Sequence, residues 1–332
     1  MIATMRWERE LHQRGARSAY AVGEDCVVLH ERLTRLVCVE RADGAVRWDI
    51  PAGTWPRAIV LAGDRVLVLP QQPDRLSCLD LGTGAVLWSV PTPRFTGHLA
   101  VTGDSVVIGG WRGYTPMAGL DLADGRVRWT KEPAVHWVTP LVWGGGVLTG
   151  AGSDAVLFDA RGGGESARWR LPEPLSGPDG DVFISLGGER VAARCGPSAL
   201  AAFGCDSGVA DWHRAYEPFA GFGYAAGSVW MHRPRSGHLA VDPADGTRRW
   251  PTDTGAGQGL VPGVVPSADG FLVGADNGLF FRLGPDGRAV SRCSSGRRLD
   301  RLVDAGNGEV FVVAKGTFGR WAVSAGCGGP AG

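Results

Sequence analysis

The sequence has almost no lysine: only Lys131 and Lys315 occur among 34 basic residues, and 34 acidic residues bring the formal net charge to zero. This balance excludes the broad basic surface of a general nucleic-acid binder. The chain also lacks the roughly 18 consecutive apolar residues that a membrane helix needs. Its first residues, MIATMRWERE, contain no apolar signal-peptide core. We therefore expect a cytoplasmic protein with no membrane or nucleic-acid partner.

Metal-ligand patterns are also missing. The seven cysteines are an odd number without Cys-x-x-Cys spacing, and the histidines show neither His-x-His nor His-Glu-x-x-His spacing. The segment HRPRSGH (232–238) has two histidines six residues apart across a turn, which is too weak a signal for a metal site. We expect no metal. Cys26, Cys38 and Cys78 lie in apolar strand patterns, which predicts buried free thiols.

Glycine, by contrast, is abundant, with 52 residues of 332, and one short glycine-containing pattern that ends in Trp recurs along the chain. The copies are DGAVRW (43–48), TGAVLW (83–88), DGRVRW (124–129), GGESARW (163–169), SGVADW (207–212), DGTRRW (245–250) and a degenerate DGRAVS (286–291). From Trp48 onward the steps are 40, 41, 40, 43, 38 and 41 residues. A period near 40 that is built from hairpins is typical of propeller blades.

Each repeat is predicted to form four strands. In the second one, RAIVLAG (57–63), DRVLVLP (64–70), RLSCLDL (75–81) and AVLWSVP (85–91) are expected as strands A to D, from the innermost to the outermost. Gly supplies the positive φ of the tight turn before strand D. The Trp of strand D is expected to pack between neighbouring blades, where it buries on the order of 200 Å².

The two ends of the chain indicate how many blades there are. Trp7 lies 41 residues before Trp48, so residues 1–10 have the outer-strand pattern without the strands that should precede it. Residues 293–326 supply three strands, and the N-terminal strand is expected to complete this last blade. The fold class is thus predicted as all-β, an eight-bladed β-propeller, with seven blades as the alternative. We expect one domain over residues 1–332, with residues 11–292 forming the other seven blades.

The repeat, apolar-x-Asp-x-x-[Thr/Asp]-Gly-x-x-x-Trp with a Gly-Asp turn before strand B (Gly63-Asp64, Gly103-Asp104), resembles the PQQ-like repeats of quinoprotein-dehydrogenase-type propellers. This resemblance implies the fold, and it covers nearly the whole chain. The family's quinone-dependent enzymes carry adjacent cysteines and a calcium site, and this sequence has neither, so a PQQ-dependent dehydrogenase is the third-ranked function. Its outer-membrane assembly lipoproteins carry a signal peptide and a lipidated Cys, which are also missing. We expect no cofactor.

A propeller site is expected at the mouth of the central channel, where the D-to-A and B-to-C connections meet. One residue at the top of each A strand would line this mouth, and His98, Phe222 and Arg301 are among them. Arg301 is a candidate to clamp a ligand carboxylate. Aromatic side chains on the connecting loops complete the predicted ligand-binding set: Trp55, Phe95, Trp111, Tyr114, Trp137, Tyr216 and Tyr224. Such a surface favours a small aromatic or apolar ligand, and it also suits a protein interface.

The same face carries titratable residues that could perform acid–base chemistry. His98, His136, His213 and Glu217 are the candidate catalytic residues. An acid and a base that face each other over an apolar floor suffice for cyclisation, isomerisation, condensation or elimination without a cofactor. The leading hypothesis is therefore a small-molecule-binding propeller, able to act as such an enzyme in a bacterial biosynthetic pathway. The alternative is a non-catalytic scaffold that binds a protein partner through the same face.

Overall fold

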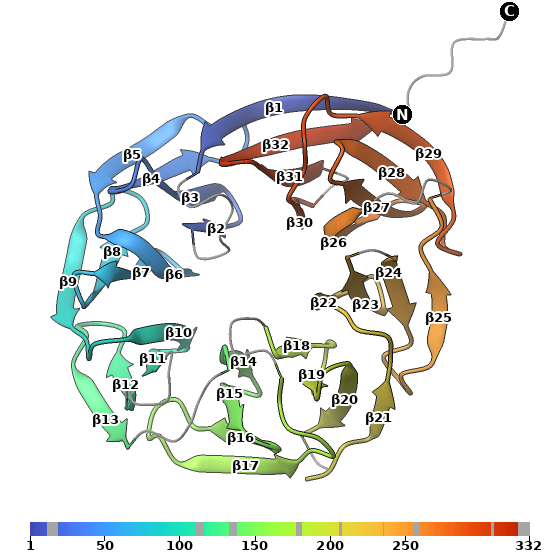
Figure 1. The fold of residues 1–332 in the computed structure, drawn as a ribbon. Coiled ribbons are helices and arrows are strands. Elements are labelled where there is room, and N and C mark those ends of the chain that lie inside the picture. The colour runs from blue at the N-terminus through green and yellow to red at the C-terminus, as the bar shows by residue number, and fades with distance from the viewer. Residues whose placement is uncertain are drawn as a thin grey trace, which may run out of the picture. The chain divides into compact units, whose positions relative to one another are not determined.

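A computed structural model describes residues 1–11, 19–110, 116–132, 138–176, 181–205, 208–234, 236–254, 259–306 and 309–324. The strands of these residues pair into eight four-stranded antiparallel sheets. Each sheet is one blade, and its strands are called A to D in their order across the sheet; each sheet can be followed in Figure 1. The described residues contain no helix that is long and apolar enough to cross a membrane.

Blades 1 to 4 follow one another along the chain. Blade 1 contains β2 (Tyr20–Val22), β3 (Cys26–Glu31), β4 (Arg35–Glu40) and β5 (Val46–Pro51). Blade 2 contains β6 (Thr54–Ala62), β7 (Arg65–Gln72), β8 (Arg75–Asp80) and β9 (Val86–Pro91). Blade 3 contains β10 (Thr96–Thr102), β11 (Ser105–Gly110), β12 (Met117–Asp121) and β13 (Val127–Lys131). Blade 4 contains β14 (Leu141–Trp143), β15 (Gly146–Ala151), β16 (Asp154–Phe158) and β17 (Glu165–Arg170).

Blades 5 to 8 continue the series. Blade 5 contains β18 (Phe183–Ser185), β19 (Arg190–Cys195), β20 (Ala199–Gly204) and β21 (Trp212–Ala215). Blade 6 contains β22 (Gly221–Ala225), β23 (Ser228–Arg233), β24 (Gly237–Val241) and β25 (Arg248–Pro251). Blade 7 contains β26 (Leu260–Ser267), β27 (Gly270–Ala275), β28 (Leu279–Leu283) and β29 (Ala289–Ser294). Blade 8 contains β30 (Arg301–Asp304), β31 (Glu309–Ala314), β32 (Thr317–Ser324) and β1 (Ile2–Glu10).

The first strand of the chain completes the last blade. β1 pairs with β32 from Ile2, opposite Ser324, to Glu10, opposite Thr317. Trp7 of β1 is buried and lies against the rings of Phe311 and Phe318, with centroids 5.9 and 6.2 Å away. The fold is an eight-bladed β-propeller with the predicted strand exchange, and the seven-blade alternative is wrong.

The chain divides into two compact units. Unit 1 comprises Met1–Gly15, Pro218–Asp242 and Thr247–Gly332, and unit 2 comprises Ala16–Glu217 and Pro243–Gly246. Unit 2 holds blades 1 to 5, and unit 1 holds the strands of blades 6 to 8. A single domain over the whole chain stays a prediction.

Neighbouring blades pack through alternating strand residues, as the period of two in a strand requires. In β7, Val66 and Val68 pack against blade 1, where they meet Val28 of β3. The intervening Leu67 and Leu69 pack against blade 3 instead. Both faces of the blade 2 sheet therefore contribute apolar side chains to contacts with a neighbouring blade. The four strands of blade 2 also lie where the sequence predicts them, within a few residues at each end.

The repeated Trp joins each blade of unit 2 to the turn between strands C and D that comes next along the chain. The indole Nε1 of Trp48 donates a hydrogen bond to the carbonyl of Leu81 at 2.8 Å. Trp88 donates in the same way to the Leu122 carbonyl at 2.9 Å. Three further indoles donate at 3.0 Å: Trp129 to Ala160, Trp169 to Gly204, and Trp212 to Pro243. Packing of these indoles between neighbouring blades, as predicted, thus includes a polar contact as well.

The predicted buried thiols are confirmed. Cys26, Cys38 and Cys78 are free and fully buried. Burial raises the pKa of each of these thiols above its ordinary value, most strongly for Cys38. Cys195 is equally buried, and burial raises its pKa to about 12. These side chains act as small core residues.

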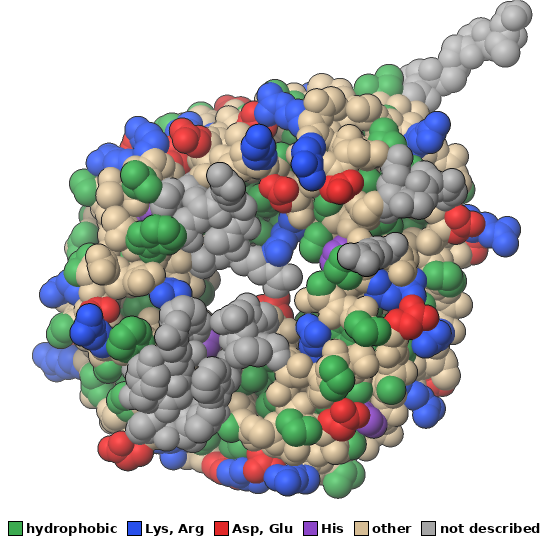
Figure 2. Space-filling view, in the orientation of Figure 1, with side chains coloured by type: hydrophobic (Ala, Val, Ile, Leu, Met, Phe, Trp, Pro, Cys, Tyr) green, Lys and Arg blue, Asp and Glu red, His purple; other side chains and the backbone are tan. Residues whose placement is uncertain are grey.

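Charged side chains of both signs are interspersed on the surface, as the face in Figure 2 shows. The outer strands carry many ion pairs. In blade 3, Arg128 Nη2 lies 3.0 Å from Asp104 Oδ2 and 2.6 Å from Asp121 Oδ2. Hydrogen bonding to Arg128 lowers the pKa of Asp104, and backbone and Arg128 hydrogen bonds lower that of Asp121.

Candidate binding site

In blades 1, 2, 4 and 5, the hairpin between strands B and C lies beside the link that follows strand D. In blade 1, the Ala52 N–H of this link donates to the Thr34 carbonyl in the hairpin at 2.8 Å. In blade 2, the Thr92 N–H donates to the Asp74 carbonyl at 3.0 Å. We call this side the B–C edge. These are the two kinds of connection that the sequence predicts to meet.

Exposed apolar side chains lie on this edge. Trp55 is 53% exposed and Phe95 43% exposed, and each stands where the chain passes from one blade to the next. Leu33, in the hairpin of blade 1, is 57% exposed. Loops at the edge of a sheet more often carry polar residues, so large apolar groups here are candidates for contact with another molecule.

Trp55 and Phe95 hold equivalent positions in the repeat. Each follows the Trp of the preceding strand D by seven residues, counted from Trp48 and Trp88. Both have a left-handed backbone, with φ of 57° and 66°. A register shift follows each of them at the start of strand A. The two adjacent blades therefore present an aromatic side chain in the same way. His136 has the same spacing from Trp129 but lies outside the described residues.

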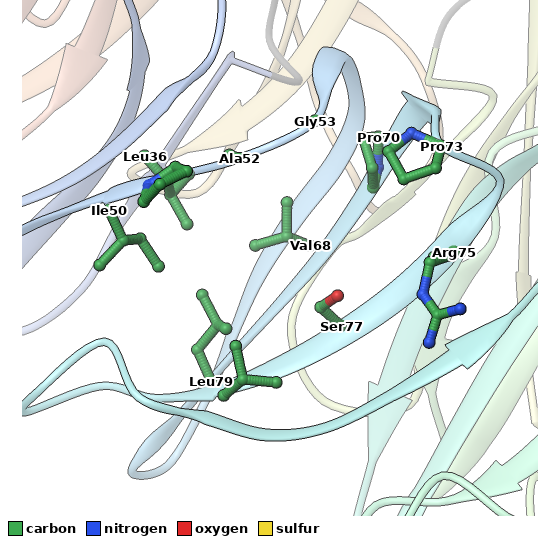
Figure 3. A pocket seen from close by; sticks show the side chains of 12 residues that line it. Leu36, Ile50, Ala52, Gly53, Val68, Pro70, Pro73, Arg75, Ser77 and Leu79 are labelled. Atoms are coloured by element: carbon green, nitrogen blue, oxygen red, sulfur yellow. The ribbon is translucent and has the colours of Figure 1, made fainter.

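A pocket of about 280 Å³ lies between blades 1 and 2. Most of its wall is apolar, and the lining residues are Leu36, Ile50, Pro51, Ala52, Gly53, Val68, Pro70, Pro73, Arg75, Ser77, Leu79 and Val86. Figure 3 shows Leu36 and Ile50 on one side of this pocket and Arg75 and Ser77 on the other. Small-molecule pockets are commonly of this size or larger.

The polar side of the pocket is a short hydrogen-bonded strip on β8 and β9. Arg75 donates from Nε to Ser89 Oγ at 3.1 Å and from Nη2 to the Ser89 carbonyl at 2.9 Å. The hydroxyls of Ser77 and Ser89, which oppose each other across the two strands, lie 2.9 Å apart. The strip thus places a cationic group and hydroxyls at the rim of an apolar cavity.

His98, a predicted catalytic residue, lies half-buried in β10. It lines a much smaller pocket, of about 20 Å³, between blades 3 and 4. The other lining residues include Met117, Val138 and the buried Thr149. The surroundings are thus mainly apolar and hold little space for a ligand.

The other predicted catalytic residues lie elsewhere. His213 belongs to β21, the outermost strand of blade 5, rather than to a loop, and its Nε2 lies 3.0 Å from Glu173 Oε1. Glu217 is exposed and lines neither of the two pockets. Of the predicted catalytic residues that the structure describes, only His98 lines one of these pockets.

The predicted ligand-binding aromatics have several different environments. Tyr216 is buried, and its hydroxyl donates to the Gly246 carbonyl at 2.7 Å. Its hydroxyl is therefore bonded within the protein rather than presented to a ligand. Phe222 is buried beside Phe219, with ring centroids 6.1 Å apart. Trp55 and Tyr224 lie in strands, β6 and β22, rather than in loops. Trp111, Tyr114, His136 and Trp137 lie outside the described residues.

Arg301 lies at the start of β30 in unit 1, where its charge acts on His232. His232 and His238 oppose each other across β23 and β24, with ring centroids 5.2 Å apart. Burial, aided by Arg301, lowers the pKa of His232 to about 4. Burial, aided by His232 and Arg233, lowers that of His238 to about 3. This pair is a feature that the spacing of HRPRSGH alone could not reveal.

Metal coordination finds no support in the part of the chain that the structure describes. No three side chains of His, Cys, Asp or Glu gather there as ligands of one ion. The positive charges of Arg233 and Arg301 near the histidine pair also disfavour a cation.

A family model described as outer membrane protein assembly factor BamB matches residues 4–185 and 58–252. The chain belongs to this family. The family comprises PQQ-like propellers, in agreement with the resemblance seen in the repeat. No curated protein sequence matches the chain significantly.

Solved structures share the fold of this BamB-family chain. BamB from Moraxella catarrhalis has a TM-score of 0.75 at 18% identity, and the match covers 98% of both chains. A quinohemoprotein alcohol dehydrogenase from Pseudomonas putida has a TM-score of 0.68 at 12% identity, over 99% of this chain and 78% of the other. The C-terminal WD40 domain of Sif2 has a TM-score of 0.71 at 9% identity, over 98% and 99%. These identities show a common fold and no more.

Proposed function

We propose that the protein is a non-catalytic scaffold that binds a protein partner through the B–C edge of blades 1 to 3. The observation that carries this proposal is the repeated presentation of an exposed aromatic side chain, Trp55 and then Phe95, on a left-handed backbone. A large aromatic residue in this conformation costs on the order of 1–3 kcal/mol, so its occurrence in two adjacent blades suggests a use.

The chemistry of the edge supports a protein partner. Trp and other aromatic residues dominate the binding energy of protein interfaces, because they bury a large area with few rotatable bonds. Leu33, on the hairpin of blade 1, is a further exposed apolar side chain of the B–C edge. The family description, an assembly factor, is in keeping with a propeller that binds other proteins.

A catalytic role receives less support from the same residues. Acid–base catalysis needs an acid and a base within reach of one substrate. His98 lies in an inner strand of blade 3, His213 lies in the outer strand of blade 5, and Glu217 lines neither pocket. Small-molecule binding without catalysis remains a second candidate, and the pocket between blades 1 and 2 favours it.

The scaffold proposal is tested by affinity capture from the source cells, with quantitative mass spectrometry of the bound proteins. The wild type is compared with a Trp55→Ala/Phe95→Ala variant and with a control, Val127→Ala/Val290→Ala, which removes exposed apolar groups from the outer strands β13 and β29. A partner that binds the wild type and the control, and is lost from the aromatic variant, is the expected result. Equal recovery with all three would contradict the proposal. Fractionation of the same cells tests the predicted cytoplasmic location.

A further inference from the structure

The pocket between blades 1 and 2 has one cationic side chain in its wall, Arg75. Because the blades are repeats, the same position can be compared from blade to blade by strand register. Arg75 lies two residues before Ser77, which pairs with Ser89 across β8 and β9. Blades 1 and 4 show how a charge at this place is neutralised.

Blade 1 has an ion pair at this place. Arg35 lies two residues before Val37, which pairs with Asp49 across β4 and β5. Its Nε donates to Asp49 Oδ1 at 2.7 Å, and its Nη2 donates to the Asp49 carbonyl at 2.9 Å. Arg32 also binds this carboxylate. The guanidinium of blade 1 is therefore neutralised within its own blade.

Blade 4 also has an ion pair here, with the arginine on the outer strand. Arg170 follows the repeat Trp169 as Asp49 follows Trp48, and it pairs with Asp154 across β16 and β17. Arg168 Nη1 lies 3.1 Å from Asp154 Oδ2, and Arg170 Nη1 lies 2.8 Å from Asp154 Oδ1. Hydrogen bonding to these arginines keeps the pKa of Asp154 below its ordinary value. In blades 1 and 4, the charged residue that follows the repeat Trp is thus paired with an opposite charge on strand C.

Blade 2 keeps the arginine and its pose but lacks the carboxylate. Arg75 makes the same two donations as Arg35, from Nε to the side chain and from Nη2 to the carbonyl, but to a serine. Within the described residues Arg75 forms no ion pair with a carboxylate. A guanidinium has five N–H donors, of which these two bonds use two. The remaining donors and the positive charge lie at the rim of the pocket.

We propose that this pocket binds a small apolar carboxylic acid, with the carboxylate held by Arg75 in place of the aspartate of blade 1. The apolar part of the ligand would lie against Leu36, Ile50 and Val68. Charge complementarity at the rim selects an acid, because an arginine and a carboxylate form strong, directional pairs. A cavity of 150 Å³ holds benzene, so about 280 Å³ accommodates a somewhat larger ligand. The inference is independent of the proposed scaffold function, since neither Trp55 nor Phe95 lines the pocket.

Isothermal titration calorimetry with three ligands of equal chain length tests the charge. Octanoate, octanol and octylamine are titrated into the purified protein at pH 7, below the concentrations at which they aggregate. We expect octanoate to bind at one site, octanol to bind about tenfold more weakly or worse, and octylamine not to bind. Equal heats for the acid and the alcohol would overturn the role of Arg75. No binding of octanoate would overturn the proposal as a whole.

Ser89→Asp is the decisive variant, because it rebuilds in blade 2 the pair that blade 1 already contains. Arg75 would then be neutralised from within, and octanoate affinity should fall about tenfold or more although the protein stays folded. Arg75→Gln should have the same effect. Arg126→Gln, which removes an arginine that is 88% exposed in its side chain on blade 3, should leave octanoate binding unchanged. Undiminished binding by Ser89→Asp would contradict the assignment.

Two further arms separate this site from its neighbours. A short peptide that ends in leucine, with a free carboxylate, is titrated in parallel with octanoate. Binding of the peptide but not of octanoate would contradict the proposal that the pocket binds a small free acid. The Trp55→Ala/Phe95→Ala variant should bind octanoate like the wild type. Failure of the scaffold proposal and failure of the pocket proposal are thus distinguishable.

Discussion

The indole of Trp48 lies flat against the backbone of Gly84, in the turn before strand D of the next blade. A Cβ on Gly84 would come within 2.8 Å of Trp48 Cδ2. This close approach lets the indole N–H reach the Leu81 carbonyl of the same turn. The turn glycine therefore does two things: it adopts a φ of 73°, and it leaves room for the Trp of the blade before it.

Gly84→Ala should destabilise the protein more than Gly63→Ala does. Both glycines have positive φ, 73° and 59°, so both substitutions introduce backbone strain of about 1 kcal/mol. Only at Gly84 would the new methyl group clash with an indole, that of Trp48. This overpacking should add about 1–3 kcal/mol to the loss of stability. Urea unfolding followed by circular dichroism measures both. Equal losses would mean that the indole moves aside without cost.

Trp55→Asn should leave the stability unchanged or raise it by about 0–1 kcal/mol. Asn tolerates the left-handed backbone at φ of 57° better than Trp does, and the exposed ring contributes little burial. Trp88→Asn, on the buried position of blade 2, should cost about 3–5 kcal/mol. Thermal unfolding of the two variants gives the comparison. A large loss for Trp55→Asn would show that its ring supports the fold rather than a contact with a partner.

The free energy of unfolding should fall as the pH is lowered from about 6.5 toward 4. His232 and His238 have pKa values lowered by burial to about 4 and about 3, whereas unfolded histidine titrates near its ordinary value. Between these values the unfolded state binds protons that the folded state excludes, so stability is fully present above about pH 6.5 and is lost below it. Each histidine contributes a slope of up to about 1.4 kcal/mol per pH unit.

Urea unfolding at a series of pH values checks this slope. His238→Leu copies blade 1, where Leu36 opposes His30 as His238 opposes His232, and it should reduce the slope by up to about 1.4 kcal/mol per pH unit. Met231→Leu, a substitution of a buried residue on the paired strand β23, should change the stability without changing the slope. An unaltered slope in His238→Leu would show that this histidine is not the group responsible.

Four thiols should resist alkylation in the native protein at pH 7. These thiols are buried, and burial raises the pKa of each: Cys26, Cys38, Cys78 and Cys195. The reagent therefore cannot reach them, and little of the reactive thiolate is present at pH 7. Cys205 is half-buried and should be labelled earlier. Iodoacetamide labelling followed by mass spectrometry identifies each site. Rapid labelling of Cys38 without urea would contradict the packing of blades 1 and 2.

The fold was predictable from the sequence because it repeats. The spacing from Trp7 to Trp250 favours eight blades, and the position of Trp7 without preceding strands indicates the strand exchange. Strand boundaries in blade 2 follow from alternating apolar residues and glycine turns, which are local signals.

The sites were less predictable because their residues occupy positions that the repeat leaves variable, or have roles that the repeat does not specify. Tyr216 resembles a loop aromatic in the sequence, but its hydroxyl binds the Gly246 carbonyl. His213 follows a repeat Trp directly and therefore lies in the outer strand, a position that the repeat itself indicates. The Arg75–Ser89 pair gains meaning only when its register is compared with that of Arg35 and Asp49.

Pairing of β1 with β32 has a consequence for synthesis on the ribosome. β1 is made before the strands of the seven other blades and its partner β32 after them, so the strand has no sheet to join while those blades are translated. Its unpaired N–H and C=O groups stay open to other strands throughout this time. The entropy cost of closing the loop between β1 and β32 grows only with the logarithm of its length. The long delay before pairing, rather than this cost, therefore exposes β1 to pairing with a wrong strand. Nascent chains of this protein should therefore depend on chaperones until translation has passed Ser324.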